Sequence, residues 1–135
     1  MTDYDAFPAR LVFARNLRSM AAVAEAHGVD VLFLTTATMY RDLPDPRDRE
    51  RFVMSAALGD KADAYPDLPS LAAGMRAFNA VVLGVPESRR VHVLDLAARV
   101  PQSWDFFYDD CHFTKAGNRR VSAELTPRAA EILRR

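Results

Sequence analysis

The sequence predicts a three-layer α/β fold, in which helices cover both faces of a short parallel sheet. Three helical patterns alternate with two apolar strand patterns along the 135 residues. Such alternation requires crossover connections that leave the strands parallel and place helices on the sheet faces. Two strands are too few for a complete sheet. We therefore expect residues 1–135 to be a single partial domain that forms one side of a larger sheet.

The first helix is expected between Pro8 and Gly28. Proline suits the first turn of a helix and glycine suits its C-terminal cap. The strand pattern "VDVLFLTT", from Val29 to Thr36, follows at once. It is β-branched and apolar on both sides, as a strand buried between two helix layers requires. Apolar residues recur at helical spacing along the helix, namely Phe13, Leu17, Met20, Ala21 and Ala24.

Residues 37–69 form a long irregular segment rich in proline and charge, in which "DRERFVMSAAL" predicts one short helix. Connections of this length are uncommon in compact domains unless they have a function. We expect the segment to overhang the candidate site described below, either as a lid that shapes substrate choice or as an inert covering loop.

A second helix is expected after the N-cap Ser70, a second strand from Val91 to Leu96, and a third helix after Thr114. Pro127 is expected to kink or restart the last helix. This order is that of the C-terminal half of a flavodoxin-like domain. Because the strand "VLFL" has an open edge, we expect either a second copy of the chain or a missing N-terminal half to pair there.

The composition excludes several classes of protein. Eighteen basic residues balance eighteen acidic ones, which gives no electrostatic reason to expect nucleic acid or an anionic membrane as partner. No apolar run is long enough to span a bilayer. The opening "MTDYDAF" lacks the features of a signal peptide, so a cytoplasmic location is expected if Met1 is the true start, and localisation is otherwise open.

The reactive side chains gather in "FYDDCHFTKAG", just before the last helix. Asp109 and His112 are three residues apart, so in a tight turn the carboxylate can accept a hydrogen bond from one ring nitrogen. The other nitrogen is then free to act as a general base. The alternative is a surface turn that happens to contain a histidine. The position favours function, because loops at the carboxyl ends of strands carry the sites of open α/β sheets.

This segment resembles the final block of the SGNH, or GDSL-type, hydrolase family, where Asp-x-x-His precedes a helix start that contains a glycine. The segments "GVDVLFLTT", "MRAFNAVV" and "VHVLDL" resemble the strand, helix and strand that come before this block, so the similarity covers the chain from about Phe7 onward. The residues that match the block are Asp109, His112, Thr114 and Gly117.

The resemblance implies a serine esterase or lipase that acts on carboxylic esters, including lipid, acyl and carbohydrate O-acetyl esters, without a metal or an organic cofactor. It implies that His112 takes the proton of a serine hydroxyl and later gives it to the leaving group. Asp109 would orient His112 and stabilise its charged form.

The family also requires a serine in a Gly-Asp-Ser block, and a glycine and an asparagine for the oxyanion hole. These blocks are absent from the sequence, in which Gly59-Asp60 is followed by Lys61. Without them we expect the chain alone to be inactive. We expect it to be the C-terminal part of such an enzyme, as a fragment or as one half of a split enzyme. The alternative is a non-catalytic binding or assembly module that retains the fold.

The remaining titratable residues are expected to be structural. Asp, Cys and His are metal-ligand types, but consecutive side chains point in different directions, so we expect no metal site in "DDCH". Cys111 is expected to be a small buried thiol rather than a nucleophile. His27 suits a helix C-terminus, His92 suits a surface or core position of a strand, and Asp95 suits a loop-anchoring role.

Overall fold

A computed structural model describes residues 8–41, 48–52 and 68–134 of the chain. The chain is a mixed α/β protein with three long helices and a two-stranded parallel sheet. The two strands pair in register from Val31 opposite Val91 to Leu34 opposite Leu94. The elements in chain order are α1 (Pro8–His27), β1 (Val31–Leu34), α2 (Asp48–Arg51), α4 (Leu68–Leu83), β2 (Val91–Leu94) and α5 (Lys115–Leu133).

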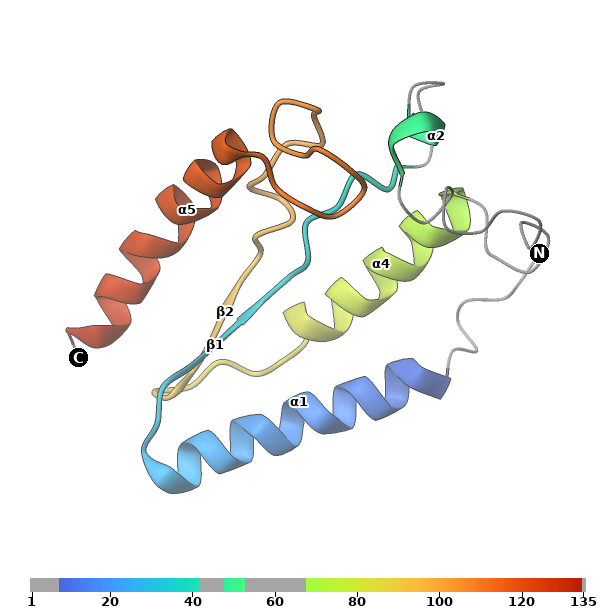
Figure 1. Cartoon of the computed structure of the whole chain (residues 1–135). Helices are drawn as coiled ribbons and strands as arrows, with labels where there is room; N and C mark the ends of the chain where they lie inside the picture. Colours follow the sequence, from blue (N-terminus) through green and yellow to red (C-terminus); the bar gives the residue numbers. More distant parts are fainter. Residues whose placement is uncertain (1–7, 42–47, 53–67, 135) are drawn as a thin grey trace.

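Helices α1 and α4 lie side by side on one side of the strand pair, and α5 lies on the other side (Figure 1). Side chains of the strands alternate between these two sides, because successive residues of a strand point to opposite faces. Phe33 and Val91 pack with Leu17 of α1 and Val82 of α4 in one buried cluster. Leu94 lies beside α5 instead, where it lines a hollow with Ala123, Pro127 and Arg128 of that helix.

Both ends of α1 follow the rules that the sequence suggested. The helix begins at Pro8 and ends at His27, and the next residue, Gly28, has a φ of 66°. The N–H of Gly28 donates to the carbonyl of Glu25, and the N–H of Val29 donates to the carbonyl of Ala24. These two bonds form a Schellman cap, which needs a residue in the left-handed region at its centre. The cap turns the chain directly from α1 into β1.

Three expected features differ in the structure. Both strands are shorter than predicted. At the carboxyl end of β1, the side chain of Asn79 on α4 bonds both backbone groups of Thr36, and the ladder ends after Thr35. Helix α4 begins at Leu68, ahead of the expected cap Ser70. Helix α5 continues through Pro127 without restarting. Pro127 lies on the exposed side, where water can bind the carbonyl that loses its intrahelical partner.

The predicted lid is described only in part. Residues 42–47 and 53–67 lie outside the described residues. Of the short helix expected over residues 48–58, the first four residues form α2, and residues 53–58 are among those not described. Within the described part, Met39 and Phe52 are buried and pack against Phe107 and Leu96 in a second core cluster. These portions of the segment therefore support the carboxyl end of the sheet from within.

Neither outer edge of the two-stranded sheet pairs with a further strand among the described residues, and the edge of β1 is the more open. The N–H groups of Val31 and Thr35 donate to the carbonyls of Arg90 and Leu94 of the β2 segment. Because polar groups of successive strand residues point to alternate sides, those of Leu32 and Leu34 point to the open edge. None of the helices in the described ranges is both long and apolar enough to cross a bilayer.

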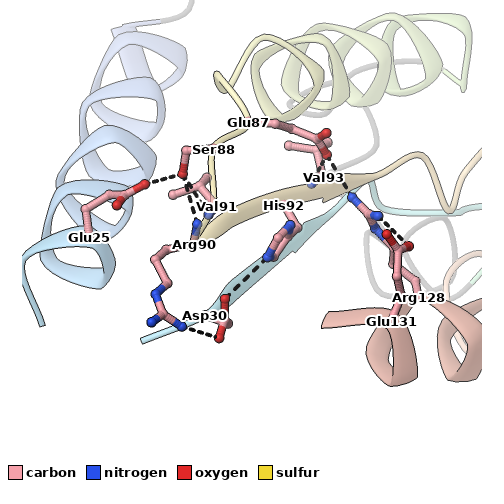
Figure 2. A network of polar contacts seen from close by, with 10 residues as sticks. All are labelled: Glu25, Asp30, Glu87, Ser88, Arg90, Val91, His92, Val93, Arg128 and Glu131. Carbon is pink, nitrogen blue, oxygen red and sulfur yellow. Dashed lines mark hydrogen bonds and ion pairs between the residues drawn. The ribbon is translucent and has the colours of Figure 1, made fainter. Parts of the chain in front are cut away.

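The amino end of the sheet is held by polar contacts between several elements (Figure 2). Asp30 lies 2.9 Å from the guanidinium of Arg90 and 3.4 Å from Nε2 of the buried His92. Arg128 of α5 contacts Glu87 at 3.4 Å, and Ser88 contacts Glu25 of α1. A surface or a core position was expected for His92, and the structure shows that it is a core histidine that contacts Asp30.

The carboxyl end is held by Thr35 and Asp95, which directly follow β1 and β2. The buried hydroxyl of Thr35 donates to the Asp95 carboxylate at 2.8 Å and accepts from the N–H of Ala97, also at 2.8 Å. The same carboxylate oxygen accepts from the N–H of Ala98 at 3.2 Å. Asp95 therefore has the loop-anchoring role expected of it, and it fixes the start of the segment that leads to Asp109.

Replacing Thr35 by valine should destabilise the fold by about 1–3 kcal/mol, because the N–H of Ala97 and the Asp95 carboxylate each lose a buried partner. Valine keeps the shape of the side chain, so the packing is retained. Urea unfolding followed by the fluorescence of Trp104, the single tryptophan, measures the change. The neighbouring exposed Thr36→Val variant is the matched control and should change stability by no more than about 0.5 kcal/mol. Equal stabilities of the two variants would contradict this role of Thr35.

Candidate active site

The segment between β2 and α5 folds back on itself as a small closed loop at the carboxyl end of the sheet (Figure 1). Phe107 and Phe113 form an isolated antiparallel bridge, and their rings lie 4.8 Å apart. The N–H of Tyr108 donates to the carbonyl of His112 at 3.1 Å. Phe107 is fully buried, so it anchors the loop in the core. The five residues 108–112 therefore form a tight turn whose two ends are held together by the Phe107–Phe113 bridge.

The start of α5 fixes the loop from the other side. The Thr114 hydroxyl donates to the carbonyl of Asp105 at 2.6 Å and accepts from the N–H of Gly117 at 3.1 Å as the N-cap. The carbonyl of Phe106 accepts from the N–H of Thr114 and lies directly over Gly117. A Cβ atom at position 117 would lie 2.0 Å from that carbonyl oxygen. This approach is the physical reason for a glycine in the segment.

The carboxylate of Asp109 accepts three hydrogen bonds within this turn. Its Oδ1 accepts from the backbone N–H of Cys111 at 3.0 Å and of His112 at 2.7 Å. Its Oδ2 lies 2.8 Å from Nδ1 of the His112 ring. Burial raises the pKa of Asp109, but the hydrogen bonds from the two N–H groups and the His112 ring outweigh it and bring the pKa below its ordinary value. Asp109 is therefore ionised and oriented toward the ring.

His112 projects outward from the same turn. Its side chain is 61% exposed, while that of Asp109 is 6% exposed. The ring stacks on Tyr108 with centroids 5.6 Å apart and an interplanar angle of 14°. In the neutral ring, a proton on Nδ1 points at the carboxylate and leaves the lone pair on Nε2. Within the described part of the chain Nε2 has no hydrogen-bond partner and can take a proton from an incoming group.

Asp110 has a different role, which the sequence reasoning missed. It is buried, its Oδ2 accepts from the Tyr40 hydroxyl at 2.7 Å, and its carbonyl accepts from the N–H of Met39 at 2.9 Å. Burial and the neighbouring Asp110 charge raise the pKa of Tyr40, so the phenol stays protonated and keeps donating. Asp110 thus ties the turn of residues 108–112 to the segment after β1. The tyrosine 70 residues away gives no local signal of this contact.

Cys111 is the least constrained member of the turn. The expected burial of Cys111 is wrong, because residue 111 lies in the outer part of the turn and its thiol is exposed. Its Sγ lies 3.6 Å from Nδ1 of His112. Partial desolvation raises the pKa of the Cys111 thiol, and the charges of Asp110 and Asp109 raise it further. Because the thiolate is the nucleophilic form, these shifts disfavour cysteine catalysis.

The geometry supports one chemical role most directly, which is that of an oriented general base. Three atoms that can bind a metal ion, one each from Asp109, Cys111 and His112, also lie within 4.8 Å of one another, and no other such group of three is found in the described ranges.

Comparison of the chain with protein-family models, curated proteins and solved structures gave no match.

Replacing Gly117 by alanine should destabilise the protein by about 2–4 kcal/mol, because the added Cβ collides with the Phe106 carbonyl. The control is Gly84→Ala, where a Cβ would meet its nearest atom at 3.3 Å and the loss should stay within about 1 kcal/mol. Urea unfolding distinguishes the two variants. A Gly117→Ala protein as stable as Gly84→Ala would contradict the close approach.

Replacing Asp109 by asparagine should invert the tautomer of His112. The asparagine oxygen can still accept from the two backbone N–H groups, but its amide then donates to Nδ1, and the ring proton moves to Nε2. Nitrogen-15 NMR of the neutral histidine ring reports which nitrogen carries the proton. The His27 ring, in the same spectra, should be unchanged. An Nδ1-protonated ring in both proteins would show that Asp109 does not set the tautomer.

Proposed function

We propose that the chain supplies the histidine and aspartate of a Ser-His-Asp triad in an SGNH-type hydrolase of carboxylic esters. The observation that carries the proposal is the 2.8 Å contact between Asp109 Oδ2 and His112 Nδ1, with the opposite nitrogen open to solvent. A buried carboxylate that orients an exposed imidazole is the arrangement a triad uses to activate a hydroxyl.

The arrangement of elements supports a flavodoxin-like architecture for the parent domain. In such a domain the last two strands of a parallel sheet are neighbours, the two helices that precede them lie on one face, and the final helix lies on the other. Helices α1 and α4 lie on one side of β1 and β2, and α5 lies on the opposite side (Figure 1). The His112 turn then occupies the end of the sheet where such folds bind their substrates.

The proposed step is acyl transfer to a serine. Nε2 of His112 takes the proton of the serine hydroxyl as its oxygen attacks the ester carbonyl, and the ring becomes an imidazolium. The ionised Asp109 stabilises that charge through Nδ1. Nε2 then returns the proton to the leaving alcohol. Water repeats the sequence to release the acid and restore the serine.

The serine itself would come from another segment. Among the described serines, Ser88 lies at the opposite end of the sheet in contact with Glu25, and Ser103 is hydrogen-bonded to Asp105 beside the loop base. The described hollow at the carboxyl end, between Tyr40 and Asn79, measures about 110 Å³, which is small for a substrate site. The nucleophile, the oxyanion hole and much of the pocket are therefore assigned to a further part of the fold.

The open edge of β1 is where that part would attach. The unpaired backbone groups of Leu32 and Leu34 can accept another strand, which would extend the parallel sheet. Beside this edge lies an apolar groove of about 450 Å³ between α1 and the start of β1. The exposed side chains of Met20, Val23 and Val29 line it. We assign both features to an N-terminal half that carries the Gly-Asp-Ser block, in the same or in a separate polypeptide.

The function is tested by hydrolysis of short-chain nitrophenyl esters by a polypeptide that joins this chain to a Gly-Asp-Ser segment. His112→Ala should lower turnover by about 10²- to 10⁴-fold, because the general base is lost. The control Arg89→Ala removes an exposed side chain just before β2, at the opposite end of the sheet from His112 and outside the apolar groove, and should retain full turnover. Equal rates for His112→Ala and the unmodified polypeptide would reject the role of His112 and favour the non-catalytic module.

A further inference from the structure

The turn that holds the catalytic pair also brings a third reactive atom close to it. Consecutive side chains ordinarily diverge, and for this reason no metal site was expected in this segment. The closed turn overcomes this divergence, because Sγ of Cys111 lies on the same side as Nδ1 of His112, at 3.6 Å. Oδ2 of Asp109 approaches the same nitrogen at 2.8 Å. A carboxylate oxygen, a thiol sulfur and a ring nitrogen thus lie within 4.8 Å of one another.

We propose that Asp109, Cys111 and His112 form a binding site for a thiophilic divalent cation of the zinc class. Zinc takes carboxylate, thiolate and imidazole ligands in a tetrahedron, often with water in the fourth position. With ordinary bond lengths, a sulfur and a nitrogen ligand of one zinc ion lie about 3.6 Å apart, and a nitrogen and an oxygen about 3.3 Å apart. The Sγ–Nδ1 distance of 3.6 Å already fits, and the Oδ2–Nδ1 distance needs to lengthen by about half an ångström. Sγ and a carboxylate oxygen of Asp109 lie within 4.8 Å of each other and would need to lie about 3.6 Å apart around the ion.

The surroundings of the three ligands favour a cation. The carboxylate of Asp109 is held in place by the N–H groups of Cys111 and His112, which bind its other oxygen. Hydrogen bonds of this kind orient ligating carboxylates in metal sites. The ring of His112 is braced by its stack on Tyr108. The exposed thiol and ring give an ion access from solvent.

Binding is balanced in charge and protons. The Cys111 thiol releases one proton to solvent, and the resulting thiolate and the Asp109 carboxylate offset both charges of the ion. The proton on Nδ1 of the neutral ring moves to Nε2, because the metal takes its place. Nε2 then lacks the lone pair that a general base needs. On the proposed function, on which this consequence rests, the ion would be a reversible inhibitor of the dyad.

Titration of the whole chain with Co²⁺ tests the site without any ester. Co²⁺ accepts the same ligands, and thiolate coordination gives a near-ultraviolet charge-transfer absorption. We expect the absorption to saturate at one equivalent and to disappear when Zn²⁺ displaces the cobalt. Cys111→Ser should abolish it and weaken Zn²⁺ binding at least about tenfold. Circular dichroism checks that each variant is folded.

His27→Ala is the matched control, because it removes an exposed histidine outside the turn and should leave both the spectrum and the affinity unchanged. His112→Ala provides a second variant and should weaken Zn²⁺ binding by at least a similar factor. Unchanged binding in Cys111→Ser and His112→Ala, or an equal loss in His27→Ala, would overturn the site. Because this experiment measures metal binding alone, a negative result would leave the ester hydrolase proposal untouched. Likewise, a lack of ester hydrolysis would leave the metal site untouched.

Discussion

The candidate site depends on one carboxylate, that of Asp109, which accepts hydrogen bonds both from backbone N–H groups and from a side chain. Asp109 uses one oxygen to close its own turn and the other to hold the ring of His112. Hydrogen bonds to an ionised group contribute about 1.5–3 kcal/mol each when they are shielded from solvent, and the carboxylate is almost fully buried. The turn and the ring orientation are therefore set by the same group, so one cannot change without the other.

The framework around this carboxylate is built from contacts at both ends of the turn. Gly117 allows α5 to start against the Phe106 carbonyl, and Asp110 reaches across to Tyr40 after β1. Thr35 and Asp95 hold the ends of the two strands together. The turn that carries the exposed ring of His112 is thus connected to both strands and to α5. Such support is what a catalytic side chain needs to keep a productive orientation.

Much of this organisation follows from local sequence rules. Pro8 and Gly28 predict the ends of α1, and the apolar runs predict both strands, because each signal acts over a few residues. The spacing of Asp109 and His112 likewise suggests their contact. The contacts that join distant segments carry no such signal. The role of Asp110 depends on Tyr40, the length of β1 depends on Asn79, and the side on which Cys111 lies depends on the closure of the whole turn.

The unpaired edge of β1 also restricts what a second copy of the chain could do. Two identical edges that meet across a two-fold axis run in opposite directions, so the joined sheet would be antiparallel at its centre. The loop of residues 108–112 in each copy would then lie at opposite ends of the four-stranded sheet. A symmetric pair formed along this edge would therefore keep the two imidazoles apart. Only a different polypeptide segment, entering in the same direction as β1, would bring its own strand end to that imidazole.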